Sequence, residues 1–588
     1  MARGNRGTAR DRAALWWLVV PVLCIGLFSR VYFTPDEPRE AALAFAMAHQ
    51  QQHAVPEFGG EYFMEKPPLL YWLAGASAAL FGPAPAALRL PGFLYALTAV
   101  AAMALVARRA AGQRAAFVTG ICTATLLVTY QVEIWLATDA PLLAGVAVAL
   151  CGLYVGFTAR SADARLGGYA TFHAGLLIAF FAKNVAGWMV PVLAFLCLIV
   201  SERRWRELVR RELWLPVPVL LAAIAAWTLS VASLPQGAEA LRVFFWNNLV
   251  GRAVDVGDHG PYGYTAGHQN SPGKYLIELP VYLLPWTGIV LAALVTSLRA
   301  ARGATGSGTA WRLGLGAVVP ATLLLSVAAT ARGVYYGPPA LGFALLAGLW
   351  AGALPEVPDR TARRWLAVTA ATIALLALVI GGLAAVAAVA PRSRAADTLV
   401  LGLVALGGAV MAAVMAGRAP GAPSTDQALY RLAAATCLLF TLCAGPLYLS
   451  LNPWLDLGRV ATRLSTVAGG PVQLVAPDET TEAMAELYLP HRADAASAPE
   501  IVWPLVQVAD RRSWKVRDWQ VFLGYRPSPG ATAPPVLPPR AGYRPACVLE
   551  RPGGRTYALY GPVAAVGSAS ASRCRAAMGE VPADDGAG

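Results

Sequence analysis

A polar segment between two apolar regions carries the first residues that could do chemistry. Residues 32–70 read YFTPDEPREAALAFAMAHQQQHAVPEFGGEYFMEKPPLL. The charged side chains of this segment are Asp36, Glu37, Arg39, Glu40, Glu57, Glu61, Glu65 and Lys66. Carboxylates act as general bases or orient a reacting group, and basic side chains bind anions such as phosphate. The segment is therefore predicted to be a functional site.

Asp36 and Glu37 are candidates either for catalysis or for capping a helix. Pro38 disfavours helical geometry at the residue before it and is well suited to open a helix, which is predicted over residues 39–48. A cap needs only one oxygen acceptor. The segment offers two carboxylates together with Arg39, so a catalytic role for Asp36 and Glu37 stays open beside the capping role.

Lysine is rare in this chain, and its positions are unusual. The four lysines are Lys66, Lys183, Lys274 and Lys515, and three of them lie at predicted external ends of membrane spans. Positive charge normally collects in cytoplasmic loops, so topology does not explain these lysines. In EKPPLL, consecutive prolines hold the backbone extended and present Glu65 and Lys66 rigidly, although an interfacial lysine that reaches toward water is the alternative.

Further candidates lie at other predicted external ends of spans. Asp139 begins a span in LATDAPL, where helix capping competes with catalysis. His259 and His268 lie in a Gly-rich external loop and could bind a metal, but for an isolated loop histidine the solvated state is favoured. Tyr335 and Tyr336 are of the type found in interfacial aromatic belts. Acids, lysines and tyrosines at one membrane surface suit a lipid-borne anionic substrate whose phosphate is bound by cations.

The composition indicates a membrane protein. The 588 residues are 57% hydrophobic and 14% charged, with a mean hydropathy of +0.52. Apolar runs near 20 residues are long enough to cross roughly 30 Å of hydrocarbon. The net charge of +13 lies in short loops that alternate with these runs, as expected for cytoplasmic loops, so we predict no nucleic-acid partner.

The elements that must position the candidate residues are about thirteen transmembrane helices. Arg3, Arg6, Arg10 and Arg12 place the N-terminus in the cytoplasm, and the apolar run that follows is predicted to be an uncleaved first span. The first periplasmic loop is then about 31–86, and a transmembrane catalytic domain covers 1–451. An odd number of spans puts the C-terminus outside.

Residues 452–588 have the composition of a small periplasmic α/β domain. Apolar runs at 472–476, 501–508 and 519–523 suggest strands, a helix is predicted over 479–489, and the Pro-rich stretch 528–545 is predicted to be a loop. The end, from about residue 568, is predicted to be disordered. Cys547 and Cys574 could form a disulfide in an oxidising compartment or remain two unpaired thiols.

Several motifs occur in the order found in one enzyme family. They are DEPREA, YFMEKPPLLYWLAGASAALFG with ALRLPG, LATDAPL, FFAKNVAG, FFWNNLVGR with SPGKYLIELPVYLLPWTG, and ARGVYYGPPALGFALLAG. From about residue 13 to 354, the sequence resembles GT-C glycosyltransferases, specifically the bacterial branch that contains lipid A aminoarabinose transferases and protein O-mannosyltransferases. The resemblance implies a GT-C membrane domain with an external soluble domain.

The resemblance also implies an activity and residue roles. The enzyme would transfer a sugar, with inversion, from a polyprenyl-phosphate donor to a periplasmic acceptor: lipid A first, with a protein or cell-envelope glycan as the alternative. Asp36 would deprotonate or orient the acceptor, and Asp139 would position groups around it. The implied substrate-binding residues are Arg39, Lys66, Lys183, Lys274, Arg332 and Tyr336, with Arg332 in place of a lysine that the family usually has. Lys66 would bind the donor phosphate, and Lys183 and Tyr336 would help to stabilise the leaving group. A zinc ion is implied between Glu65 and either His259 or His268, although the loop near His268 departs from the usual spacing.

A membrane transporter is the main competitor from another class, since charges within membranes also mark transport pathways. The sequence shows no repeat of two halves, and its charges cluster at one membrane surface instead of the midplane. A bacterial inner-membrane glycosyltransferase is therefore the preferred interpretation.

Overall fold

The computed structural model describes residues 2–33, 36–250, 273–300, 306–328, 332–389, 398–475, 477–489, 502–509, 542–551 and 555–566. The described residues form two compact units. The first, here the helical unit, consists of Met1–Ser29, Ala46–Gly382 and Val404–Gly445. The second, here the mixed unit, consists of Arg30–Phe45, Leu383–Leu403 and Pro446–Gly588.

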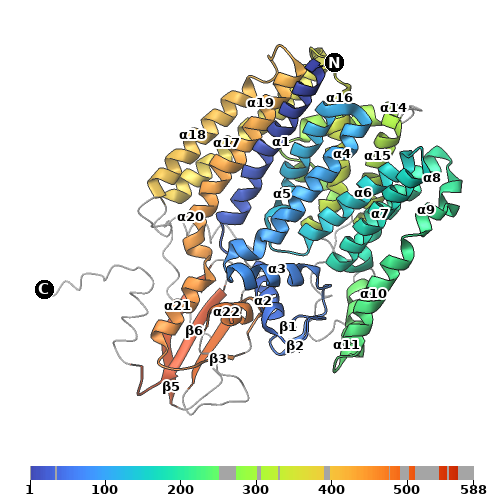
Figure 1. Ribbon diagram of the computed structural model, residues 1–588. Coiled ribbons are helices and arrows are strands. Elements are labelled where there is room, and N and C mark those ends of the chain that lie inside the picture. Colours follow the sequence, from blue (N-terminus) through green and yellow to red (C-terminus); the bar gives the residue numbers. More distant parts are fainter. Residues whose placement is uncertain are drawn as a thin grey trace. The chain divides into compact units, whose positions relative to one another are not determined.

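The helical unit is built from helices joined by short connections (Figure 1). The α-helices that lie wholly or largely in it are α1 (Ala2–Phe28), α3 (Leu69–Phe81), α4 (Pro85–Thr125), α5 (Leu127–Ile134), α6 (Asp139–Thr158), α7 (Ala162–Lys183), α8 (Met189–Glu202), α9 (Arg211–Trp214), α10 (Val217–Ala232), α11 (Gly237–Arg242), α13 (Lys274–Tyr282), α14 (Thr287–Ala300), α15 (Gly306–Val327), α16 (Gly337–Ala353), α17 (Arg360–Ala388), α18 (Thr398–Gly417) and α19 (Thr425–Leu438). Helices suit these apolar runs because each backbone N–H finds its acceptor within the same segment.

Shorter turns connect some of these helices. They are the 3₁₀ helices η1 (Asn184–Trp188), η2 (Trp205–Val209) and η4 (Gly333–Tyr336), and the π-helices η3 (Val243–Val250) and η5 (Leu439–Ala444).

Eight helices among the described residues are long and apolar enough to cross a membrane, or nine if the bent pair α13 and α14 counts as one. Two of these segments contain a residue whose backbone departs from helical geometry. Gly112, in α4, has φ 86°, and Asn184, between α7 and α8, has φ 57°. The count of about thirteen spans stays a prediction.

A bend interrupts the helical segment that begins at Lys274. Helices α13 and α14 meet at 120°, because Pro280 and Pro285 remove backbone donors near the bend, and the bent pair can still count as one span. The helix predicted to begin at Arg39 is α2 (Asp36–His49), which begins at Asp36. Pro38 therefore lies within the first turn of α2, where a missing N–H costs no intrahelical hydrogen bond.

Helices α6 and α7 approach each other closely because glycines line their contact. A Cβ atom at Gly145 would lie 2.7 Å from the backbone nitrogen of Ala179, and one at Gly152 would lie 2.2 Å from that of Phe172. Any larger side chain would force the helices apart. This contact brings the first residue of α6 beside the last residue of α7.

The mixed unit contains a four-stranded sheet (Figure 1). Its strand order is β3 (Val472–Val475), β4 (Trp503–Ala509), β6 (Arg555–Pro562) and β5 (Tyr543–Arg551), with β3 parallel to β4 and the other pairs antiparallel. Helices α21 (Leu457–Val467) and α22 (Glu479–Tyr488) bury Leu464 and Met484 in the same core as Leu505 and Leu559 of the sheet. Helix α20 (Gly445–Leu455) precedes α21.

The predicted strands at 472–476 and 501–508 and the helix at 479–489 match β3, β4 and α22. The predicted loop 528–545 is wrong at its end, because Tyr543–Pro545 belong to β5. β5 is an edge strand with a register shift beside Pro545, which is where a sheet tolerates a proline. Cys547 is disulfide-bonded, whereas the predicted partner Cys574 and the run 519–523 lie outside the described residues.

Candidate functional site

An ion pair joins two of the predicted site residues. Asp139 is the first residue of α6, Lys183 is the last residue of α7, and the lysine Nζ contacts the Asp139 Oδ1. The side chains of Lys183 and Asp139 are 16% and 11% exposed. The Lys183 Nζ also lies 4.7 Å from the centre of the Tyr335 ring, within the range of a cation–π contact. The predicted phosphate-binding lysine is thus held by an acid and an aromatic ring.

Tyr336, the residue after Tyr335, is fully buried in a stack of aromatic rings. Its ring centre lies 5.5 Å from that of Tyr275 and 5.5 Å from that of Tyr282. Its hydroxyl oxygen is 2.6 Å from the Thr322 hydroxyl. Burial raises the pKa of Tyr336 to about 12, so the phenol stays neutral and can donate a hydrogen bond.

The same stack fixes the segment that carries Arg332. The Tyr275 hydroxyl donates to the Arg332 carbonyl oxygen at 3.1 Å. Lys274, at the start of α13, lies 4.0 Å from Glu278, whose carboxylate also accepts from the Tyr282 hydroxyl. The tyrosine stack therefore contacts the backbone of Arg332 through Tyr275 and shares Glu278 with Lys274 through Tyr282.

Lys66 lies between a short hairpin and α3. The hairpin pairs β1 (Glu57–Phe58) with β2 (Glu61–Tyr62) across Gly59 and Gly60, which have φ 61° and 85°. Both values lie in the left-handed region, where glycine has no steric penalty. Lys66 is 9% exposed, and Glu65 precedes it.

An aromatic cluster connects the Lys66 segment with the end of α7. Trp227 of α10 donates its indole N–H to the Ala54 carbonyl at 3.0 Å, and its ring packs 5.8 Å from Phe181, two residues before Lys183. Phe244, in η3, is fully buried 5.2 Å from Trp227, so this part of η3 packs against protein.

In the mixed unit, Arg39 is shared among three carboxylates. Its guanidinium lies 3.6 Å from Asp36, 2.9 Å from Glu40 and 2.6 Å from Glu479 of α22. Asp36 makes the longest of these contacts, and its side chain is 14% exposed whereas that of Glu40 is fully buried. Asp36 is accordingly the acid of the two that a reactant can approach.

Glu37 has a different environment. Its carboxylate pairs with Arg30 at 2.9 Å and accepts from the Phe33 backbone N–H at 2.8 Å, and the Glu37 side chain is fully buried. The Arg30 guanidinium also stacks 4.7 Å from the centre of the Phe33 ring. These contacts fix the chain just before α2.

The sequence did not reveal Glu479 as a partner of Arg39. The two residues are 440 positions apart, and Glu479 sits at the start of a helix where a capping role explains it equally well. No local pattern encodes a contact of that separation.

The predicted zinc site is only partly within the described residues. Glu65 is described, but His259 and His268 lie outside the described ranges. Elsewhere in the described part of the chain, no group of three or more His, Cys, Asp or Glu residues is placed to hold a metal ion.

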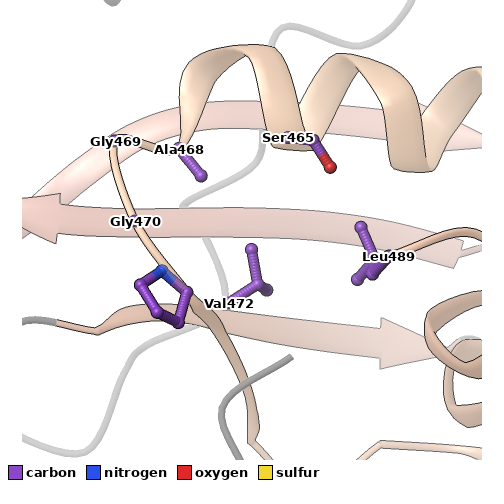
Figure 2. Close-up of a pocket in the computed structure, with 7 residues that line it drawn as sticks. Ser465, Ala468, Gly469, Gly470, Val472 and Leu489 are labelled. Atoms are coloured by element: carbon purple, nitrogen blue, oxygen red, sulfur yellow. The ribbon is translucent and has the colours of Figure 1, made fainter. Parts of the chain in front are cut away.

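A pocket of about 370 Å³ in the mixed unit lies where α21 leads into β3, beside Gly469 and Gly470 (Figure 2). Its described lining contains no charged side chain, and Ser465 is its only side-chain hydroxyl.

Comparisons with known proteins agree with the fold. Residues 65–229 match the family model described as dolichyl-phosphate-mannose-protein mannosyltransferase. The crystal structure of ArnT from Cupriavidus metallidurans bound to undecaprenyl phosphate aligns with a TM-score of 0.68 and 18% identity over 93% of this chain and 97% of that chain. The predicted GT-C membrane fold is confirmed.

The sequence is also similar to enzymes named undecaprenyl phosphate-alpha-4-amino-4-deoxy-L-arabinose arabinosyl transferase. The protein from Edwardsiella ictaluri is 30% identical over 346 residues, which cover 57% of this chain and 59% of that protein. The protein from Pseudomonas paraeruginosa is 28% identical over 291 residues, 48% of this chain and 51% of that protein. The matched region thus spans about half to three-fifths of these relatives. The resemblance to bacterial aminoarabinose transferases is confirmed.

Proposed function

We propose that this chain is an integral-membrane glycosyltransferase that moves a 4-amino-4-deoxy-arabinose-type sugar from a polyprenyl-phosphate carrier to lipid A. The observation that carries the proposal is the 30% identity over 346 residues to an enzyme named for that donor. The fold supports it, since an ArnT chain with the same architecture was crystallised with undecaprenyl phosphate.

The reaction would take place at the periplasmic side of a bacterial inner membrane, with the N-terminus in the cytoplasm and the C-terminal domain in the periplasm. The positions of the arginine-rich loops support this orientation. The partners are the lipid-linked donor and a lipid acceptor.

The charged residues suit the chemistry of this transfer. Breaking the bond between the anomeric carbon and the phosphate oxygen leaves the bonding pair, and hence negative charge, on the polyprenyl phosphate. Lys66, Lys183, Lys274 and Arg332 would stabilise that charge, with Tyr336 as a neutral donor. Removing one preorganised group of this kind typically costs about two to three orders of magnitude in rate.

Asp139 would hold Lys183 in position until the phosphate binds. The two side chains are in contact, so the incoming phosphate would compete with the Asp139 carboxylate for the same ammonium. Arg39 would hold Asp36, whose partly exposed carboxylate would orient the acceptor. A lipid A phosphate is already ionised and needs no general base, whereas a hydroxyl acceptor would need Asp36 as the base.

Glu37 would hold the start of α2 in place and would not contact the substrate, because Arg30 and the Phe33 backbone N–H already occupy its carboxylate. A zinc ion bound by Glu65 and His259 or His268 would supply Lewis-acid chemistry, and no step above depends on it.

A protein or cell-envelope glycan acceptor is the second candidate. It is favoured by one observation, the match of residues 65–229 to a family model described for protein mannosyltransferases. The donor-side chemistry would be the same, and only the acceptor would differ.

The test uses the purified full-length protein in liposomes that contain lipid A and undecaprenyl-phosphate aminoarabinose. We expect the mass of lipid A to rise by the sugar residue, and Asp36→Asn or Lys66→Met to abolish the change. Asp163→Asn, at an exposed position in the first turn of α7, is the matched control and should retain the wild-type rate. Near-normal transfer by both site variants would contradict the assignment.

A further inference from the structure

A carboxyl group without a partner lies just before the Asp139–Lys183 pair. Glu133 is near the end of α5 and is 4% exposed, and among the described residues neither of its carboxylate oxygens has a hydrogen-bond partner. The Thr138 hydroxyl, in the turn that leads into α6, is fully buried and also lacks a partner there. One unsatisfied polar group therefore lies just before the four-residue turn Trp135–Thr138, and the other is the last residue of that turn.

Other carboxylates buried to a similar degree have cationic partners. Glu37 pairs with Arg30 at 2.9 Å, and Glu40 pairs with Arg39 at 2.9 Å. Glu207 pairs with arginines on both sides and accepts from a tyrosine hydroxyl. Glu133 departs from this rule, and a buried polar group left unsatisfied destabilises the fold. A buried carboxyl group that has no cationic partner in the described part of the protein suggests that its partner is a group of the substrate.

The end of α5 borders the same residues as the proposed donor site. α5 packs against η4, which contains Tyr335 and Tyr336, and against α6, which begins at Asp139. A Cβ atom at Gly337 would lie 3.1 Å from the Val132 Cγ2, which shows how close the last turn of α5 is to the tyrosine segment. Glu133 is the next residue along this turn.

We propose that Glu133, together with the Thr138 hydroxyl, binds a cationic substituent of the donor sugar, namely the ammonium group of an amino sugar. The inference rests on the proposed function and names the substrate feature that the site selects. A single carboxylate and a hydroxyl match one ammonium, which needs two or three acceptors. They fall short of the six to eight oxygen ligands of a calcium site.

Burial also determines how protons move when the ligand binds. Burial raises the pKa of Glu133 well above its ordinary value, because it disfavours the charged carboxylate and favours the protonated carboxyl group when no cation is bound. Binding of an ammonium then forms a carboxylate–ammonium pair and releases the carboxyl proton to water. Binding should therefore tighten as the pH rises toward the pKa of the sugar amine.

The test measures equilibrium binding of two donors to the full-length protein in lipid nanodiscs. The probes are undecaprenyl-phosphate 4-amino-4-deoxy-arabinose and undecaprenyl-phosphate arabinose, which has a hydroxyl in place of the amine. We expect wild type to prefer the amino sugar by about tenfold or more, since hydrogen bonds of a charged ammonium with a carboxylate are stronger than those of a neutral hydroxyl. Glu133→Gln should erase that preference and its pH dependence while leaving affinity for the neutral donor unchanged.

Glu239→Gln is the matched control, since Glu239 is an exposed residue of α11 that pairs with Arg242. It should keep the wild-type preference. Thermal unfolding verifies that Glu133→Gln is folded. Equal loss of affinity for both donors, or no loss for either, would overturn the inference and leave Glu133 a structural or water-bound group. A wild-type protein that prefers the amino donor but transfers no sugar would contradict the proposed function alone.

Discussion

Replacing Lys183 with methionine tests whether the Asp139–Lys183 pair serves catalysis or only the fold. Methionine keeps most of the apolar stem and removes the ammonium that contacts Asp139 and lies 4.7 Å from the Tyr335 ring centre. If the ammonium stabilises the leaving phosphate, the transfer rate should fall by about two to three orders of magnitude. If the pair is structural, the rate should follow the amount of folded protein.

The free energy of unfolding gives the second readout. Removing one partner of a fully buried pair costs about 3–5 kcal/mol because the other charge stays buried. The side chains here are 16% and 11% exposed, so some solvent reaches the pair. We expect Lys183→Met to lower the free energy of unfolding by about 2–3 kcal/mol, near the lower limit for buried pairs.

A double variant separates the two effects. Asp139→Asn combined with Lys183→Met leaves no buried charge, so most of the lost stability should return while transfer stays low. The measurements are thermal unfolding in detergent and transfer to lipid A in liposomes, with Arg242→Met, an exposed position in α11, as the control. Wild-type transfer by the double variant would refute the catalytic reasoning, because restored folding alone would then explain activity.

Three further predictions concern packing and protonation. Gly145→Val should abolish transfer and destabilise the protein, because a Cβ at this position would already lie 2.7 Å from the Ala179 nitrogen. Gly382→Val is the control, since no atom lies within 4 Å of a Cβ there. Equal loss of transfer and of stability in both variants would contradict the packing argument. Glu207→Gln should lower the free energy of unfolding by about 3 kcal/mol, because it leaves Arg204 and Arg210 without their buried carboxylate. An unchanged melting temperature would show that these two ion pairs do not stabilise the protein. Burial raises the pKa of Glu133, so wild type loses stability as the pH rises above about 4.3, the value of an unfolded glutamate. Glu133→Gln should therefore be more stable than wild type at pH 8 and equal to it near pH 4, and parallel melting curves at all pH values would exclude the raised pKa.

The sequence predicted the types of the site residues better than their partners. Lys66 and Lys183 stood out because positive charge is rare at external ends of spans, and that signal is local. The contact of Arg39 with Glu479 is not local, since 440 positions separate the residues. The aromatic cluster around Trp227 was missed for a related reason: tryptophan and phenylalanine near a membrane surface indicate an interfacial belt as readily as a protein core.

The bounds of helices and strands were also hard to predict where they depend on contacts between distant residues. Apolar runs predicted helices, but the 120° bend between α13 and α14 depends on how two prolines are used, and prolines occur in straight membrane helices as well. Strands β5 and β6 were not predicted. The start of β5 was assigned to a loop because Pro545 indicates a loop unless the strand is at an edge, and a sheet edge is a property of the assembled sheet.

The departure at Arg332 shows how a site can accept a different cation. The resemblance predicts a lysine in this turn, and an arginine is not an equivalent replacement, since its planar guanidinium binds phosphate through two donors whereas an ammonium is a compact point charge. The structure holds the backbone here through the hydrogen bond from Tyr275 to the Arg332 carbonyl. With the backbone fixed, the longer side chain changes how far from the turn its charge lies. Arg332→Lys would shorten the side chain and keep its positive charge. A loss of donor affinity in this variant would show that the length and bidentate geometry of arginine, and not charge alone, determine how this site binds the phosphate.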